Sequence, residues 1–367
     1  MNRLPGLDLL RALAIVWVML FHAMTMGLVP ESFQLARYGW MGVDLFFALS
    51  GFLIGGQLFR PYARGEPPAL GRFFARRLAR TLPPYLLVLA LYFTWPAFRE
   101  RPQIQPLWQF ATFTENLFID SRGGKAFSQV WSLCIEEQFY LVAPLTIWVM
   151  MRRPSAWRTV LVLAAILVGG MAWRGYVWTH AMAPFSPESV TFHRAWQEKI
   201  YYATATRLDD LLGGVTLALM RAFRPQWWRG LMDRGNLVLS LSLAALAGSA
   251  ALFVNQGDLV PNVIGYPILA LATTGLVAAG ASPASLIGRW RLPGAGPIAA
   301  MAYSVYLTHK QAYHLVQLWG GQGVAGPLAL LAYPSAALAL GAALYLTAER
   351  PALTLRDHWI GSAPPSS

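Results

Sequence analysis

The sequence predicts an all-α fold, a polytopic membrane helix bundle of about ten transmembrane helices. Three observations support this prediction: the composition, the spacing of apolar runs and the distribution of arginine. Hydrophobic residues make up 56% of the 367 residues and charged residues 13%, whereas soluble domains have about 45–50% and about 25%. The mean hydropathy is +0.43. Too few polar side chains remain to cover a water-facing surface, which excludes a disordered chain, a coiled coil and a soluble globular enzyme.

A bilayer core about 30 Å thick requires roughly 20 mostly apolar residues per helix. Segments of this kind are separated mostly by clusters of Pro, Gly or Arg, which mark turns and loop ends. The segments are residues 7–28, 38–59, 82–98, 131–151, 159–178, 206–221, 236–254, 261–281, 297–317 and 327–348. We expect one membrane domain over residues 1–360 and a short disordered tail over 361–367. The first segment is expected to be a retained helix, because polar residues interrupt it and no convincing cleavage site follows.

The net charge of +12 comes from arginine, since only three of the 29 basic residues are lysine. Apolar segments separate these arginines, which favours the positive-inside rule over nucleic-acid binding. With the N-terminus in the cytoplasm, 18 basic residues lie on the cytoplasmic side, 8 on the outer side and 3 within the spans. We therefore expect both termini in the cytoplasm and the helices in the lipid bilayer of the inner membrane. One cysteine and six scattered histidines indicate no disulfide framework and no metal site.

The first apolar segment carries a polar face. A charge in hydrocarbon costs about 2.5–3.5 kcal/mol on insertion scales, so it should face the bundle interior and be paired. Arg11 and His22 are eleven residues apart, which places them on one helix face about 16 Å apart along the axis. Asp8 lies one turn before Arg11 and can pair with it. A lone histidine would suit an interhelical hydrogen bond, but Arg11 on the same face favours a polar cavity through the bundle.

A second polar face is expected in the segment 130–141, at the outer end of its helix. Ser132, Glu136 and Tyr140 repeat every four residues and share a helix face. The adjacent Glu137 points about 100° away from Glu136, so only one of the two glutamates can easily face the same cavity. A carboxylate and His22 at similar depth can form an acid/base pair. The alternative, an interfacial aromatic belt, explains the aromatic residues and not the glutamates.

A basic helix face is expected between residues 72 and 85. Arg72, Arg76 and Arg80 share a helix face, with Arg77 beside them. Cytoplasmic topology explains much of this charge, but an ordered arginine stripe also suits phosphate, which guanidinium binds bidentately. Three further residues are expected to make helix-packing contacts rather than to act in catalysis: Arg207, Asp209 and His309, the last of which lies beside Tyr306 and Lys310.

These segments together resemble one family. LDLLRALAIVWVMLFH (7–22) is similar to an Arg-x10-His signature, matched by Arg11 and His22, and GVDLFFALSGFLIG (42–55) is similar to a Gly-Val-Asp-x-Phe-Phe motif. Further matches are RRLAR (76–80), WSLCIEEQFYL (131–141), TRLDDLLGG (206–214), SVYLTH (304–309) and ERP (349–351). The chain thus resembles acyltransferase family 3, integral membrane O-acyltransferases mostly of bacteria that modify surface glycans.

The resemblance implies transfer of an acyl group from cytoplasmic acyl-CoA, with acetyl-CoA as the first choice, to a hydroxyl, usually on a sugar. His22 would be the general base on this hydroxyl or would carry the acyl group transiently. Glu136 would be its partner, preferred over Glu137 because it matches the family's glutamate. Phosphates of CoA would be held by Arg76, Arg77 and Arg80, while Arg11 would neutralise charge at the inner mouth of the cavity. The residues expected to shape the cavity are Asp44, Ser132 and Tyr140.

Two alternatives remain at this stage. The same chemistry could act on a small-molecule acceptor such as a macrolide, or the protein could be a transporter without catalysis. Transporters usually have paired broken helices in two related halves, and the sequence shows no such symmetry. Some members of the family carry a fused extracytoplasmic hydrolase-like domain, whereas this sequence ends soon after its last span. We therefore expect acceptor delivery by the membrane domain alone or by a separate partner protein.

Overall fold

The computed structural model describes residues 4–122, 125–320 and 326–361, and the described residues form helices without a β-strand. Apart from Gly361, the predicted tail lies outside the described residues. Each of the predicted apolar segments overlaps a long helix. These helices are α1 (Pro5–Thr25), α3 (Met41–Ala63), α4 (Leu70–Thr94), α6 (Val130–Met151), α7 (Ala156–Val177), α9 (Asp209–Phe223), α11 (Gly235–Leu252), α12 (Tyr266–Ala281), α14 (Ala295–Gly320) and α15 (Gly326–Leu344).

Short helices and single turns connect or extend the long ones. The separate short helices are α2 (Gln34–Arg37), α5 (Leu107–Ala111), α8 (Val190–Trp196), α10 (Pro225–Asp233) and α13 (Leu286–Arg289). A π-helical turn, Trp178–Met182, extends α7, and another, Tyr345–Glu349, joins α15 to α16 (Arg350–Ile360). The long helices are thus not all regular to their ends.

In the described part of the chain, seven helical stretches are long and apolar enough to cross a membrane. The polytopic membrane bundle is therefore confirmed, whereas the count of ten spans stays a prediction. The three remaining long helices differ from these seven in recognisable ways. Helix α9 has 15 residues, α4 carries the arginine stripe in its first half, and α14 contains the polar run Thr308–Gln311.

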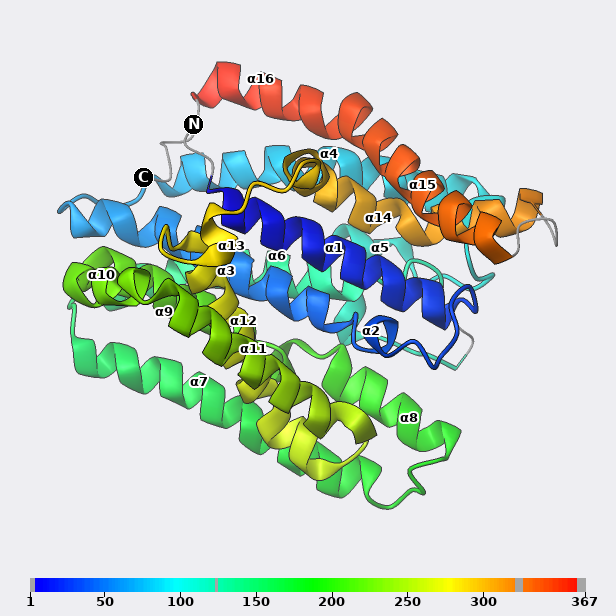
Figure 1. Cartoon of the computed structure of the whole chain (residues 1–367), viewed down its shortest axis with the longest axis horizontal. Coiled ribbons are helices and arrows are strands. Elements are labelled where there is room, and N and C mark those ends of the chain that lie inside the picture. Colours follow the sequence, from blue (N-terminus) through cyan, green and yellow to red (C-terminus); the bar gives the residue numbers. More distant parts are fainter. Residues whose placement is uncertain (1–3, 123–124, 321–325, 362–367) are drawn as a thin grey trace.

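The long helices run roughly side by side along the molecule (Figure 1). Helix α1 packs against α3, α12 and α14, and α3 packs against α9. Small residues allow the last contact: a Cβ on Gly51 would lie 2.2 Å from the carbonyl oxygen of Leu211, and one on Gly214 would lie 2.1 Å from that of Ala48. Close approach of backbones at glycine is typical of helix pairs in membranes. It gives a packing reason for Gly51 in the segment GVDLFFALSGFLIG (42–55).

The two ends of the bundle differ in what they carry. At the left of Figure 1, α1 begins and α16 ends, next to α10 and to the connection between α3 and α4. Helices α2 and α8 lie at the right of the view. The arginine-rich segments thus gather at the left end, which the sequence predicts to be cytoplasmic. The orientation itself stays a prediction.

Candidate active site

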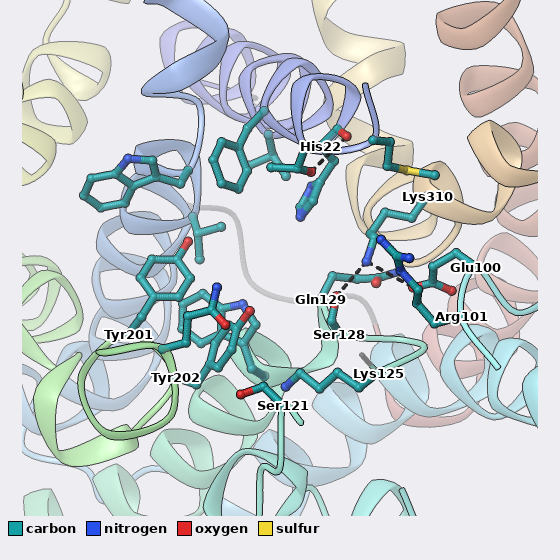
Figure 2. A pocket seen from close by; sticks show the side chains of 18 of the residues that line it. His22, Glu100, Arg101, Ser121, Lys125, Ser128, Gln129, Tyr201, Tyr202 and Lys310 are labelled. Atoms are coloured by element: carbon teal, nitrogen blue, oxygen red, sulfur yellow. Dashed lines mark hydrogen bonds and ion pairs between the residues drawn. The ribbon is translucent and has the colours of Figure 1, made fainter. Parts of the chain in front are cut away.

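A polar cavity of about 560 Å³ lies where α1 ends and α14 meets the loops. His22, three residues before the end of α1, projects into it (Figure 2). Lys310 reaches the cavity from α14, and the connection between α4 and α6 provides Glu100 and Ser128. Aromatic rings form much of the wall: Phe21, Trp40, Trp131, Trp196, Tyr201, Tyr202 and Tyr306. The cavity therefore combines a histidine, a cation and a carboxylate with aromatic surfaces.

His22 is held by a second histidine. Nδ1 of His22 lies 2.9 Å from Nε2 of His309, which is fully buried on α14. Nδ1 of His309 lies 3.1 Å from the carbonyl oxygen of Val305 and 3.0 Å from that of Tyr306. Because a carbonyl only accepts, this nitrogen carries the hydrogen, and Nε2 of the neutral ring is an acceptor. His22 then donates from Nδ1, which leaves its Nε2 unprotonated on the cavity side.

We expect His309→Ala to lower the rate of a reaction in which His22 accepts a proton. The hydrogen bond from His22 to His309 orients the ring and strengthens when His22 becomes positively charged. Hydrogen bonds to charged groups contribute about 1.5–3 kcal/mol, so kcat should fall roughly 10- to 150-fold. The measurement is kcat for acyl transfer by the purified variant. A variant with unchanged kcat would contradict the positioning role of His309.

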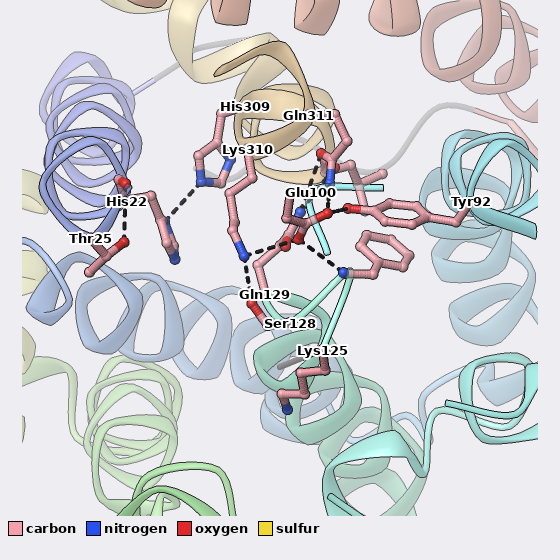
Figure 3. A network of polar contacts seen from close by, with 12 residues as sticks. His22, Thr25, Tyr92, Glu100, Lys125, Ser128, Gln129, His309, Lys310 and Gln311 are labelled. Carbon is pink, nitrogen blue, oxygen red and sulfur yellow. Dashed lines mark hydrogen bonds and ion pairs between the residues drawn. The ribbon is translucent and has the colours of Figure 1, made fainter. Parts of the chain in front are cut away.

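Glu100 and Lys310 form an ion pair on the cavity wall (Figure 3). Nζ of Lys310 lies 3.0 Å from Oε1 of Glu100 and donates to the hydroxyl of Ser128 at 2.6 Å. Glu100 also accepts from the backbone N–H of Phe127 at 3.0 Å and from the hydroxyl of Tyr92 at 2.8 Å. Burial alone would raise the pKa of Glu100, but the Lys310 ammonium and these hydrogen bonds outweigh it and lower the pKa. Glu100 is therefore a charged, fixed partner of Lys310.

Glu136 does not meet His22, which corrects the expected acid/base pair. Its carboxylate accepts from Tyr140 at 2.6 Å, from Ser50 at 3.2 Å and from Arg77 at 3.3 Å. Glu136 lies six residues inside α6, about 9 Å from its first residue, and does not line the cavity. His22 instead contacts His309 on α14, whereas the partners of Glu136 lie on α3, α4 and α6. A role of Glu136 in catalysis stays a prediction.

The predicted phosphate-binding arginines lie away from the cavity. Arg77 contacts both Glu136 and Glu137, the latter at 3.8 Å, and stacks on Tyr140 at 3.6 Å. Both glutamates thus reach the same guanidinium, and neither lines the cavity. Arg76 donates to the carbonyl oxygen of Gly361 at 3.2 Å. Arg80 is partly buried one turn beyond Arg76 on α4.

Near the start of α1, Arg11 pairs with Asp8 at 3.1 Å, as the helix spacing predicts. Neither residue lines the cavity, so the described cavity does not extend along this face of α1 to Arg11. Ser132, predicted to shape the cavity, lies behind its wall. Its hydroxyl is 2.6 Å from that of Tyr306, which in turn donates to the backbone oxygen of Gln129 at 3.0 Å. Ser132 therefore fixes a wall residue rather than facing the cavity itself.

Two ion pairs are buried in the bundle, and one of them contacts the aromatic wall of the cavity. Arg207 donates to Asp44 at 2.8 Å, and both side chains are 0% exposed. Arg174 makes two hydrogen bonds to Asp209, at 2.7 and 2.9 Å. The rings of four aromatic residues surround the Arg207 guanidinium at 4.5–6.0 Å: Trp40, Trp131, Tyr201 and Tyr266. Three of these rings, Trp40, Trp131 and Tyr201, also line the cavity. Asp44 and Arg207 thus hold the aromatic wall in place.

Comparison with known proteins identifies the family. A family model described as an acyltransferase domain, Acyl_transf_3, matches residues 4–346, nearly the whole chain. The chain belongs to this acyltransferase family. Among curated proteins it is 28% identical over 342 residues to the O-acetyltransferase OatA of Staphylococcus aureus, an alignment that covers 87% of this chain and 52% of that protein. No solved structure matches the chain significantly.

Two further relatives of this acyltransferase carry names that specify a glycan. The peptidoglycan O-acetyltransferase OatA of Listeria monocytogenes is 30% identical over 234 residues, covering 60% of this chain and 34% of that protein. The putative peptidoglycan O-acetyltransferase YrhL of Bacillus subtilis is 29% identical over 232 residues, covering 59% of this chain and 33% of that protein. The chain spans about half the length of the Staphylococcus relatives and about a third of these two.

Sequence reasoning missed Glu100 as a site residue of this acyltransferase and gave Lys310 no role beyond a neighbour of His309. Glu100 lies between Arg99 and Arg101, in a segment predicted to be a loop. A charged side chain in a water-exposed loop has no desolvation penalty, so its presence there does not indicate a functional site. Lys310 offered a signal, since it is a lysine inside a predicted span and such charges are expensive without a partner.

Proposed function

We propose that this chain is a multi-pass membrane O-acyltransferase that transfers acetyl from acetyl-CoA to a hydroxyl of a cell-wall glycan. The observation that carries the proposal is the position of His22 in a polar cavity, with its Nδ1 2.9 Å from Nε2 of His309, whose own Nδ1 faces two backbone carbonyl oxygens. Membership of an acyltransferase family supports the reaction type. The names of the relatives support acetyl as the group and peptidoglycan as the kind of acceptor.

His22 has the geometry of a general base. Its Nε2 would take the proton of the acceptor hydroxyl as that oxygen attacks the thioester carbonyl. The carbon–sulfur bond then breaks, and the protonated histidine returns the proton to the CoA thiolate. In a second route, Nε2 itself attacks the thioester and carries the acetyl group to the acceptor. Both routes require the nitrogen that the hydrogen bond to His309 leaves unprotonated.

The donor would enter from the arginine-rich end of the bundle, on the cytoplasmic side of the inner membrane. Arg76 and Arg80 share a face of α4 and are partly exposed, which suits the phosphates of CoA. Arg77 is engaged by two glutamates and a tyrosine ring, so phosphate would have to displace part of that contact. The acceptor would reach the cavity at the opposite end, directly or through a separate delivery protein.

The proposal is tested with purified protein in nanodiscs, acetyl-CoA labelled in the acetyl group, and glycan fragments of the cell wall. We expect base-labile label on the glycan and one free CoA thiol for each ester formed. The same incubation with macrolide in place of glycan tests the small-molecule acceptor. Movement of label across proteoliposomes without release of CoA thiol would instead support a transporter and contradict the proposal.

We expect Arg80→Ala to weaken donor binding. Loss of a charge-assisted hydrogen bond to phosphate costs about 1.5–3 kcal/mol, so the KM for acetyl-CoA should rise roughly 10- to 150-fold with a smaller change in kcat. The matched control is Arg158→Ala, an exposed arginine at the start of α7, which should leave KM unchanged. Equal KM values for the two variants would remove Arg80 from the donor site.

A further inference from the structure

Lys310 brings an ammonium group into the cavity that contains His22 (Figures 2 and 3). An ammonium has three N–H donors. In the described part of the chain two of them have partners, the carboxylate of Glu100 at 3.0 Å and the hydroxyl of Ser128 at 2.6 Å. One donor of Lys310 is therefore left for a molecule in the cavity.

The surroundings of Glu100 hold Lys310 in this position. The side chain of Glu100 is 4% exposed and that of Lys310 is 10% exposed. Because Phe127 and Tyr92 also donate to Glu100, the carboxylate is fixed independently of the lysine. A charge fixed before the reaction stabilises a transition state without the cost of reorganisation. The pair is thus built to hold the ammonium group in place.

The other cations of the cavity are less well placed for such a role. Lys125 pairs with the buried Glu115 at 3.1 Å and lies over the ring of Tyr202 at 4.2 Å. Arg101 is exposed to solvent at the cavity edge, where water screens its charge. Lys310 is also the cation that follows His309 directly in the chain, so one helix, α14, places both the support of His22 and this ammonium group.

We propose that Lys310 is a catalytic residue that donates its third N–H to the carbonyl oxygen of the acyl group. This assignment rests on the function proposed above. As the acceptor oxygen attacks, its proton passes to Nε2 of His22, the new carbon–oxygen bond forms, and the electron pair of the C=O bond moves onto oxygen. Lys310 stabilises this oxyanion. When the C=O bond re-forms, the carbon–sulfur bond breaks, and the sulfur takes its electron pair and the proton from His22. An oxyanion also forms if His22 attacks first.

The test compares Lys310→Met, Glu100→Gln and the double variant Lys310→Met/Glu100→Gln in the acetyl-transfer assay. Loss of one oxyanion donor typically costs about 10²–10³-fold in kcat. We expect a loss of this size in Lys310→Met, with the KM for acetyl-CoA changed less than threefold. The melting temperature of each variant is measured alongside, because Lys310→Met leaves the Glu100 carboxylate buried without its counter-charge.

The double variant separates catalysis from structure. Removing both charges leaves no unpaired ion, so its melting temperature should recover relative to Lys310→Met. If Lys310 is catalytic, kcat stays low in the double variant. If Lys310 is only a structural partner of Glu100, kcat recovers together with stability, which overturns the assignment while the wild type remains active. A wild type that forms no ester and releases no CoA would instead overturn the proposed function, and the assignment with it.

A spectroscopic measurement reports the contact directly. A hydrogen bond from Lys310 polarises the thioester carbonyl, so ¹³C-labelled acetyl-CoA bound to the wild type should show a lower carbonyl stretching frequency than free acetyl-CoA. Lys310→Met should abolish this shift, and Lys310→Arg should retain part of it because the charge is kept. The same shift in the wild type and in Lys310→Met would contradict the contact.

Discussion

Replacing His22 by alanine is expected to lower kcat for acetyl transfer by about 10²–10⁴-fold, the usual contribution of a positioned general base. The hydrogen bond to His309 leaves Nε2 of His22 as the proton acceptor in the cavity, and alanine provides no replacement. His309 is fully buried and turned toward its own backbone carbonyls, so it is poorly placed to substitute.

The control for this variant is His193→Ala, an exposed histidine on α8, which should keep wild-type kcat. Rapid quenching in denaturant at neutral pH, which spares an acid-labile acyl-imidazole, distinguishes the two proposed routes when labelled acetyl-CoA is used. Label that stays on wild-type protein and is absent from His22→Ala indicates a transient acyl-histidine, whereas unlabelled wild-type protein during turnover indicates direct transfer. A folded His22→Ala variant with wild-type kcat would remove His22 from the mechanism.

The membrane architecture could be predicted because it depends on composition and on local patterns. Every predicted apolar segment overlaps a long helix, and the contact between Asp8 and Arg11 follows from their spacing within one helix. The boundaries differ where a helix carries polar residues, as in α4, which begins at Leu70, twelve residues before the predicted segment 82–98. There the arginine-rich stretch is helical but not apolar, so hydropathy alone does not register it.

The partner of His22 could not be predicted in the same way. Periodicity shows which residues share a face of one helix, but it does not show which faces of two distant helices meet. His309 lies 287 residues from His22 in the chain, whereas depth and the family motif predict Glu136. The predicted pair of Glu136 with His22 is absent because the carboxylate of Glu136 accepts hydrogen bonds from Arg77, Tyr140 and Ser50 within the bundle. Contacts between helices thus determine the partner of Glu136, which the periodicity within a single helix cannot show.

The arginines illustrate a second limit of sequence reasoning. The stripe on α4 predicts phosphate binding, yet Arg77 lies between two glutamates and a tyrosine ring. Arginines of one motif therefore differ in their surroundings: Arg77 joins α4 to α6, while Arg80 lies on a partly exposed face of α4 near the carboxyl groups of Glu136 and Glu349. Charge type and spacing do not distinguish these roles, because both use the same guanidinium geometry.

Replacing Asp44 by alanine is expected to produce the largest loss of stability among single substitutions at the aromatic wall. Asp44 is the partner of Arg207, and both side chains are fully buried. Removing one partner of a buried ion pair typically costs about 3–5 kcal/mol, and the loss here should lie toward the lower end because the buried carboxyl group of Asp210 is a second electrostatic neighbour of Arg207. The aromatic rings around Arg207 offset part of this cost, but they also line the cavity. Asp44→Ala should therefore reduce acetyl transfer together with the melting temperature.

The double variant Asp44→Leu/Arg207→Met tests whether the charge itself causes this loss. It removes both ions while keeping apolar volume, so its melting temperature should lie above that of Asp44→Ala. Asp120→Ala is the matched control, since Asp120 pairs with Arg122 on the surface, and exposed ion pairs contribute little. Thermal unfolding in detergent gives the comparison. If Asp44→Ala and Asp120→Ala melt at the same temperature, the Asp44–Arg207 pair does not hold the aromatic wall. In that case α3 does not support the cavity that contains His22 through this ion pair.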